Sequence, residues 1–270
     1  MLKTEMRNPN TMQIHRLDTM HQLQLMNEEN YNAVKAVEAA LPQIEPAVNA
    51  ITQAFQEGGR LFYIGAGTSG RLGVIDAAEC PPTFGVDPGM FVGIIAGGDR
   101  MLRTASEKAE DDPLAGVNDL KQHNLCSKDA VVGISAAGGA EYVLQAIAYA
   151  QTLGCVTVGI SSNPGSPLDK AVQYPICTDT GAEVITGSTR LKAGTAQKLV
   201  LNMLSTVSMI RCGYVYENLM VNLKPSNIKL KKRVISIVGQ ILRCDEAEAT
   251  AQLEQNDWSI RKVLDANGIT

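Results

Sequence analysis

Short apolar runs alternate with amphipathic segments along the middle of the chain. The apolar runs read as strands, at residues 60–65, 91–96, 129–135, 155–161 and 174–179. Between them, residues at helical spacing predict helices over 69–79, 104–122 and 140–153. This alternation predicts an α/β fold, a three-layer sandwich with a five-stranded parallel sheet between two layers of helices. Such sheets bind ligands beyond the carboxyl ends of their strands, so the loops after the strands are where a site is expected.

Helical segments flank this central region on both sides. Residues 28–57 carry apolar side chains at helical spacing, and a second long helix is expected over 189–211 with Ser188 as its N-cap. After Pro225 the chain becomes basic and amphipathic, and its remainder reads as three short helices. We therefore predict a helical segment that packs on the core (1–57), an α/β domain (58–225) and a small helical unit (226–270).

Composition excludes several classes of partner. The 270 residues have a formal net charge of −4 and only 4% aromatic residues, whereas surfaces for nucleic acids or anionic membranes need a basic excess. Residues 1–20 lack the apolar core of a signal peptide, and no apolar run approaches the ~20 residues that span a bilayer. Six scattered cysteines without a C-x-x-C pair are typical of reduced thiols. We expect a cytoplasmic protein without nucleic-acid or membrane partners.

The histidines limit the chemistry further. His15, His21 and His123 form no H-E-x-x-H motif and no cluster with cysteines, so we expect no metal site. None of them lies near a predicted strand end, which argues against a serine triad. Acid–base chemistry therefore depends on carboxylates or lysines.

The stretch GAGTSGRLG, residues 65–73, matches G-x-G-x-x-G between a strand and a helix. That outline is typical of a dinucleotide-binding loop, which also needs an acidic residue about 20 positions later to hold a ribose. Asp87 precedes the next strand and Asp99 comes late, so this residue is missing. Thr68 and Ser69 instead place hydroxyl groups at a helix start, where a phosphate monoester with three terminal oxygens can use them. The alternative reading is that they only cap the helix.

A second hydroxyl-rich helix start occurs in GSTRLKAGTAQK, residues 187–198. Two such starts suit one small phosphorylated ligand better than an extended dinucleotide. The candidate substrate-binding residues in the two segments are Gly67, Thr68, Ser69, Gly70, Arg71, Ser188, Thr189 and Lys192.

Two carboxylates stand out by position. Glu79 ends the helix that the phosphate loop begins, where an acid opposes the helix dipole and so suggests a functional reason. Glu110 lies in ASEKAEDDPLAG beyond the second strand, and by spacing alone the first reading is that it is one of several surface acids.

Several long motifs in this order resemble one family, the N-acetylmuramic acid 6-phosphate etherases of the sugar isomerase (SIS) fold. They are YIGAGTSGRLGVIDAAECPPTFG, IIAGGDR, AEDDPLAGVNDL, SSNPGSP and TGSTRLKAGTAQKLVLNMLST, with TEMRNPNTMQI near the start. The resemblance covers roughly residues 4–240. It implies a SIS domain over 58–225, a UBA-like unit over 226–270, a homodimer, and no metal or nucleotide cofactor. It also implies a carbon–oxygen lyase that cleaves the D-lactyl ether of N-acetylmuramic acid 6-phosphate, giving N-acetylglucosamine 6-phosphate and D-lactate during cell-wall recycling.

The resemblance assigns roles to both carboxylates. Glu79 in DAAECPP matches the acid that protonates the departing lactate, and Glu110 in EKAEDD matches the base that removes the C2 proton of the open-chain sugar. One must be protonated while the other is ionised, so their surroundings should separate their pKa values. Ten helical residues span about 15 Å, more than a sugar phosphate allows between Ser69 and Glu79. This spacing leads to the hypothesis of an active site shared across the dimer.

The loop after the third strand departs from the family. Where the family carries Ser-Gly-Arg-Thr-Pro-Tyr, this chain reads Ala137-Gly138-Gly139-Ala140-Glu141-Tyr142. Two hydroxyls and a cation are lost, and a carboxylate is expected near the phosphate. Ser135 replaces the lost hydroxyls only if the loop shifts. These changes leave open a second class, a non-catalytic sugar-phosphate sensor like the related glucokinase regulatory protein, and a sugar-phosphate isomerase is a third.

Overall fold

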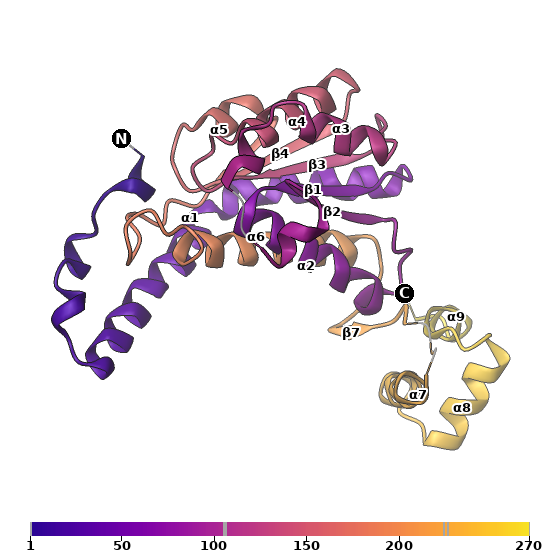
Figure 1. The fold of residues 1–270 in the computed structure, drawn as a ribbon. Helices are drawn as coiled ribbons and strands as arrows, with labels where there is room; N and C mark the ends of the chain where they lie inside the picture. Colours follow the sequence, from indigo (N-terminus) through magenta and orange to yellow (C-terminus); the bar gives the residue numbers. More distant parts are fainter. Residues whose placement is uncertain (1, 105–106, 224, 226, 270) are drawn as a thin grey trace. The chain divides into compact units, whose positions relative to one another are not determined.

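The computed structural model describes residues 2–104, 107–223, 225 and 227–269 (Figure 1). The chain forms two compact units. The α/β unit comprises Met1–Ala78 and Gly89–Ser208, and the C-terminal unit comprises Glu79–Pro88 and Met209–Thr270. In the structure the main part of the C-terminal unit therefore begins at Met209. The sequence predicts that this unit begins at residue 226, which lies outside the described residues. None of the described helices combines the length and apolar character needed to cross a membrane.

Parallel strands form the centre of the α/β unit. Within the described residues the sheet has the order β2-β1-β3-β4-β5. The strands are β1 (Leu61–Gly65), β2 (Phe91–Ile95), β3 (Ala130–Ile134), β4 (Val156–Ser161) and β5 (Tyr174–Cys177). Every residue of β1 and β3 is buried, because helices cover both faces of the sheet. The predicted α/β class with a five-stranded parallel sheet is confirmed.

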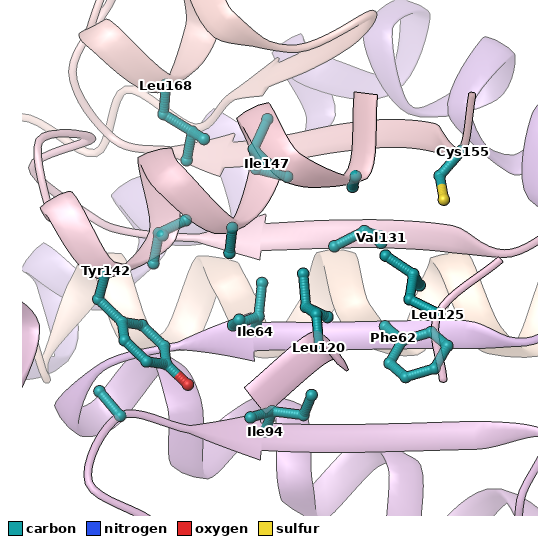
Figure 2. Close-up of a cluster of buried hydrophobic side chains, with 14 residues drawn as sticks. Phe62, Ile64, Ile94, Leu120, Leu125, Val131, Tyr142, Ile147, Cys155 and Leu168 are labelled. Atoms are coloured by element: carbon teal, nitrogen blue, oxygen red, sulfur yellow. The ribbon is translucent and has the colours of Figure 1, made fainter. Parts of the chain in front are cut away.

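One helical layer consists of α3 (Ala115–Gln122), α4 (Glu141–Thr152) and α5 (Pro167–Ala171) (Figure 1). Figure 2 shows the buried cluster beneath it, in which Phe62, Ile64 and Val131 of the strands meet Leu120 of α3 and Ile147 of α4. The other layer contains α1 (Thr19–Gln56), α2 (Gly67–Phe84) and α6 (Lys192–Arg211). There Asp76 of α2 accepts hydrogen bonds from Tyr63 of β1 (2.8 Å) and from Asn202 of α6 (2.6 Å), which fixes both helices against the sheet.

Several helices differ from their predicted bounds. Helix α2, predicted over 69–79, runs to Phe84 through Pro81 and Pro82, so Glu79 lies inside the helix and does not end it. Helix α1 begins at Thr19, because the side chain of Asp18 accepts the N–H of His21 (3.1 Å) and caps it. The single helix expected over 104–122 is wrong, and residues 105–106 of it lie outside the described residues. Short 3-10 turns η4 (Asp99–Leu102) and η5 (Glu107–Asp111) precede α3. Pro113 interrupts the pattern, and Asp112 then accepts the N–H groups of Leu114 (2.9 Å) and Ala115 (3.1 Å), which starts α3 afresh.

The C-terminal unit has its own core. A two-stranded ribbon, β6 (Val215–Tyr216) with β7 (Leu219–Met220), leads to the three helices expected in the tail, α7 (Ile228–Leu242), α8 (Glu246–Gln255) and α9 (Ile260–Ala266). Each helix has a side-chain N-cap, from Asn227, Asp245 and Ser259 respectively. Apolar side chains from all three helices bury one another in this unit.

Candidate active site

The strand order places a crevice between β1 and β3. The chain leaves β1 toward β2 on one side and leaves β3 toward β4 on the other, so the two loops diverge at this switch point. A pocket of about 280 Å³ lies there. Its lining consists of residues 66–69 after β1, residues 134–137 and Ala140 at and beyond the end of β3, Gly187 and Thr189 before α6, Glu110 of η5, and Glu5. The topology thus brings together the two loops that the sequence indicated.

The loop after β1 turns into α2 without an intervening segment. A Cβ on Gly70 would lie 2.5 Å from the carbonyl oxygen of Gly65, so only glycine allows the helix to start this close to the strand. The N–H of Gly70 makes a helical bond to Ala66 (3.2 Å). Backbone N–H groups earlier in a first turn have no partner within the helix. Thr68 and the backbone N–H groups of this first turn therefore offer hydroxyl and amide donors to an anion. The hydroxyl of Ser69 also lies at the pocket, but it donates to the Oε1 atom of Gln197 (3.0 Å).

The loop after β3 supplies a hydroxyl from Ser135. Its oxygen accepts the N–H of Gly138 (3.1 Å), which leaves its own O–H to donate to a ligand. Gly138 has φ +74°, and a Cβ there would lie 2.3 Å from the hydroxyl oxygen of Ser166, so glycine is required for this tight turn. Glu141 lies on α4, where its carboxylate accepts a hydrogen bond from Gln145 (3.3 Å), and it is not part of the pocket lining. The prediction that Glu141 places a carboxylate near the phosphate is therefore wrong.

The start of α6 differs from the prediction. The helix begins at Lys192, and Ser188 does not cap it. The buried carboxylate of Glu183 instead accepts the N–H groups of Lys192 (3.0 Å) and Ala193 (2.9 Å). This internal acid takes the position in which an anionic ligand would bind at a helix start. From this segment, Gly187 and Thr189 line the pocket and Ser188 does not.

Lys192 is buried, with 1% of its surface exposed. Its ammonium lies 2.5 Å from the carboxylate of Glu29, which also accepts hydrogen bonds from Asn8 (2.8 Å) and Asn10 (2.9 Å). Burial by itself would raise the pKa of Glu29, but these hydrogen bonds and the charge of Lys192 outweigh it and hold that pKa below its ordinary value. The structure therefore places Lys192 in an internal ion pair and away from the pocket lining, because the side chain serves the packing of α1 on α6.

Arg71 and Gly70 also stand outside the pocket lining. The guanidinium of Arg71 donates to the carbonyl oxygens of Met101 (2.7 Å), Leu102 (3.2 Å) and Thr104 (3.0 Å). It thus holds the segment of η4, which leads to η5 and Glu110.

The two candidate carboxylates fall in different units. Glu110 of η5 lines the pocket. Glu79 belongs to the C-terminal unit and is exposed, and its carbonyl accepts the hydroxyl of Thr83 (2.6 Å). Among the described residues, no group of three His, Cys, Asp or Glu side chains is arranged to hold a metal ion.

Glu5 lines the pocket and was missed by the sequence analysis. It lies in the 3-10 turn η1 (Lys3–Glu5), which the chain holds firmly. The hydroxyl of buried Thr4 accepts a hydrogen bond from Asn163 (3.0 Å), and the carbonyl of Thr4 accepts the N–H of Gly187 (3.2 Å). Lys3 forms an ion pair with Asp179. No periodicity in this polar segment indicates partners that lie so far along the chain.

Comparisons with known proteins identify relatives of the whole chain. The chain is 55% identical over 258 residues to an N-acetylmuramic acid 6-phosphate etherase of Glaesserella parasuis, a match that covers 95% of this chain and 85% of that protein. It is 51% identical over 255 residues to N-acetylmuramic acid 6-phosphate etherase 2 of Vibrio cholerae, covering 94% and 83%. Residues 43–151 match the family model of the glucokinase regulatory protein N-terminal SIS domain.

Solved structures of low sequence identity share the fold. A phosphosugar isomerase homologue from Bacteroides fragilis has a TM-score of 0.54 at 20% identity, covering 73% of this chain and 94% of that one. Phosphoheptose isomerase from Neisseria gonorrhoeae has a TM-score of 0.53 at 14% identity, covering 70% and 97%. The architecture is therefore that of SIS domains. With half of its residues identical to those of named relatives over nearly its full length, the chain belongs to the N-acetylmuramic acid 6-phosphate etherase family.

Proposed function

We propose that this protein is an N-acetylmuramic acid 6-phosphate etherase that releases D-lactate and N-acetylglucosamine 6-phosphate. The main structural support for this proposal is the set of side chains that line one pocket. A pocket at the β1/β3 switch point combines the hydroxyl groups of Thr68, Ser69, Ser135 and Thr189 with the carboxylate of Glu110. The hydroxyls suit a sugar phosphate, and the carboxylate suits proton abstraction beside it. We also propose a cytoplasmic location, which fits six scattered cysteines without a C-x-x-C pair.

We propose that the phosphate lies against the first turn of α2 and the Ser135 loop. A phosphate monoester has three terminal oxygens, and hydroxyl and backbone N–H donors form charge-assisted hydrogen bonds with them. Gly67, at the start of α2, lets the backbone approach the anion because it has no side chain, and its φ of +53° suits glycine. This arrangement needs no cation from Lys192 or Arg71, whose charges are used inside the protein.

The reaction is an elimination followed by hydration. Glu110, as the base, removes the C2 proton, which is acidic because C1 is an aldehyde in the open-chain sugar. The C2–H electrons form a C2=C3 double bond, and the C3–O bond breaks as Glu79, as the acid, protonates the lactate oxygen. Water then adds across the double bond, with oxygen on C3 and hydrogen on C2, which gives N-acetylglucosamine 6-phosphate. Each carboxylate exchanges one proton in each half of the cycle.

A direct assay tests the function. The purified protein is incubated with N-acetylmuramic acid 6-phosphate, and D-lactate is measured. Release of D-lactate in proportion to enzyme is the expected result. A protein that releases none, but whose Tm rises with a sugar phosphate, would instead be a sensor of the same fold.

Ser135→Ala should weaken substrate binding. It removes a hydroxyl donor to a charged group, which is worth about 1.5–3 kcal/mol or roughly tenfold to hundredfold in affinity. We expect KM for N-acetylmuramic acid 6-phosphate to rise by that factor. The matched control is Ser205→Ala, because the Ser205 hydroxyl donates to Leu201 within its own helix (3.2 Å) and lies outside the pocket lining. An unchanged KM in Ser135→Ala would contradict this placement of the phosphate.

We further propose a homodimer in which Glu79 of one subunit serves the pocket of the other. The helical spacing of about 15 Å between Ser69 and Glu79 supports this arrangement. So does an apolar stripe on α1, whose members recur at helical spacing on a face separate from the buried one. The stripe consists of Met20, Leu23, Tyr31, Val34 and Leu41, which are 46–61% exposed. Exposed apolar faces of this kind mark protein contacts, and C2 dimers are the commonest oligomers.

Val34→Lys combined with Leu23→Lys should convert the dimer to a monomer and remove most activity. The charges would have to be buried in an apolar contact, which is strongly unfavourable. Sedimentation velocity measures the mass, and Ala39→Lys, an exposed position on α1 outside the stripe, is the control. A double variant that remains dimeric would contradict a role for the stripe.

Complementation tests the sharing itself. Glu79→Gln and Ser69→Ala subunits are each inactive or weak alone. After random exchange, half of the dimers are mixed, and one of two sites in each is intact, so about a quarter of wild-type activity should return. Verified mixed dimers without recovery would show that each subunit uses its own Glu79.

A further inference from the structure

We infer that Gln197 positions the Ser69 hydroxyl and so controls the affinity of the pocket for phosphate. This inference rests on the proposed function, because it concerns the same sugar-phosphate site. Ser69 is 8% exposed, and Gln197 of α6 is 1% exposed. The Ser69 hydroxyl lies 3.0 Å from the Oε1 atom of Gln197. Gln197 is not part of the pocket lining, so it acts through Ser69 rather than on a ligand directly.

The hydrogen bond between them uses the only proton of the Ser69 hydroxyl. While Ser69 donates to Gln197, its oxygen presents lone pairs to the pocket, and lone pairs repel a phosphate oxygen. At the same time the Nε2 atom of Gln197 is buried and has no hydrogen-bond partner among the described residues. A buried NH2 group without an acceptor is costly, and native proteins rarely keep one without a reason.

A half-turn of the carboxamide resolves both problems when a phosphate is present. The two ends of the amide have the same shape, so the turned side chain occupies the same space. Its Nε2 then donates to the Ser69 oxygen, and the Ser69 proton is directed to the phosphate. The buried atom left without a partner becomes a carbonyl oxygen, which proteins tolerate better than a lone N–H. In the structure Ser69 donates to Gln197, and we expect a bound phosphate to reverse the direction of that bond.

Glutamine is the side chain that can take both states. A glutamate of the same length can only accept when ionised, so Ser69 must keep its proton pointed at position 197. A methionine of similar length neither donates nor accepts strongly. The Ser69 hydroxyl can then donate to the phosphate, but no hydrogen bond from position 197 orients it. The inference therefore predicts that affinity for the phosphate is highest with glutamine at position 197, lower with methionine and lowest with glutamate. A role of Gln197 in packing alone does not predict this order.

The test measures binding of N-acetylglucosamine 6-phosphate by titration calorimetry, which does not depend on turnover. Gln197→Glu should raise Kd by at least about tenfold at pH 8, because a charge-assisted hydrogen bond is lost. Its Kd should fall toward the wild-type value as pH is lowered, since a protonated carboxyl donates as the amide does. Gln197→Met should change Kd by about threefold or less, because the hydroxyl still donates but is no longer guided. Equal losses in Gln197→Glu and Gln197→Met would overturn the inference.

The same substitution made in a Ser69→Ala protein shows whether the new carboxylate acts through the Ser69 hydroxyl or repels the phosphate directly. On that background Gln197→Glu should add less than about threefold to Kd, because the group it controls is gone. An undiminished tenfold effect would mean that the new charge acts on the phosphate itself, and the inference would fail. If Gln197→Glu does not fold, Gln197→Met decides alone. A Kd that Gln197→Met raises by up to about threefold, and that the same change does not raise on the Ser69→Ala background, supports the inference. An unchanged Kd, or one as high as that of Ser69→Ala, refutes it.

Wild-type turnover keeps this test separate from that of the proposed function. A protein that binds the sugar phosphate with the predicted coupling but releases no D-lactate would refute the etherase proposal and leave this inference standing. A protein that releases D-lactate without the coupling would do the reverse.

Discussion

Glu110→Gln should almost abolish D-lactate release while leaving sugar-phosphate binding close to that of wild type. Glutamine has the shape of glutamate but cannot accept the C2 proton, and loss of a general base lowers kcat by about 10²–10⁴-fold. The Kd for N-acetylglucosamine 6-phosphate should change little, because the phosphate is held by hydroxyl and amide groups. Asp111→Asn is the matched control, since Asp111 is an exposed acid of the same 3-10 turn and lies outside the pocket lining.

Deuterium exchange separates the base from the acid. In D2O the wild-type protein should exchange the C2 hydrogen of the product, because the reverse of the hydration step also passes through C2 proton removal. Glu110→Gln should exchange it far more slowly, whereas Glu79→Gln should lose lactate release more than exchange. A Glu110→Gln protein that keeps more than half of the wild-type kcat would remove Glu110 from the role of base.

Lys192→Met should destabilise the α/β unit by about 3–5 kcal/mol, because removing one member of a buried ion pair leaves the other charge without its partner. Glu29 is that partner, and its side chain is only 5% exposed. Urea unfolding at pH 7 measures the loss. Lys198→Met, an exposed position on the same helix, should change the free energy of unfolding by less than about 0.5 kcal/mol. The double variant Glu29→Gln/Lys192→Met should recover much of the loss, and no recovery would contradict the pairing.

The same pair predicts a pH dependence. The pKa of Glu29 in the folded protein lies below its ordinary value of 4.5, so Glu29 contributes stability above that value. This contribution is lost as pH falls through the lowered folded pKa, because the folded state must then take up a proton against its hydrogen bonds. As pH falls below about 4.5, the free energy of unfolding of the wild-type protein should therefore drop more than that of the double variant.

The hydrophobic pattern was sufficient to predict the sheet but not the details of the site. Strands such as β3 are apolar throughout because both faces are covered, and that signal is local. The hydroxyls of Thr68 and Ser69 could be found for the same reason, since they follow a strand directly. Glu5 and Glu183 could not be found, because their roles depend on segments that meet only in the folded chain.

Lys192 illustrates why residue type alone misleads. A lysine at a helix start near hydroxyls suggests a phosphate ligand, but its partner Glu29 lies 163 residues earlier in the chain. Only the packing of α1 on α6 decides which anion the ammonium meets. For Ser135 the sequence predicted a position after the third strand but not whether its hydroxyl would face the pocket. That depends on the tight turn of the loop, which Gly138 makes possible.

The attachment of residues 3–11 has a consequence for the order of assembly during synthesis. This segment leaves the ribosome early, yet Thr4, Thr11 and Lys3 bind partners 159, 173 and 176 residues further along the chain. Contacts of such long sequence separation form late. When a nascent chain has just completed the loop after β1, the segment with Glu5 has been made but its partners Asn163 and Gly187 have not, so Glu5 is not yet held at the pocket. The pocket becomes complete only when most of the α/β unit has emerged, so unfinished chains should not sequester the sugar phosphate.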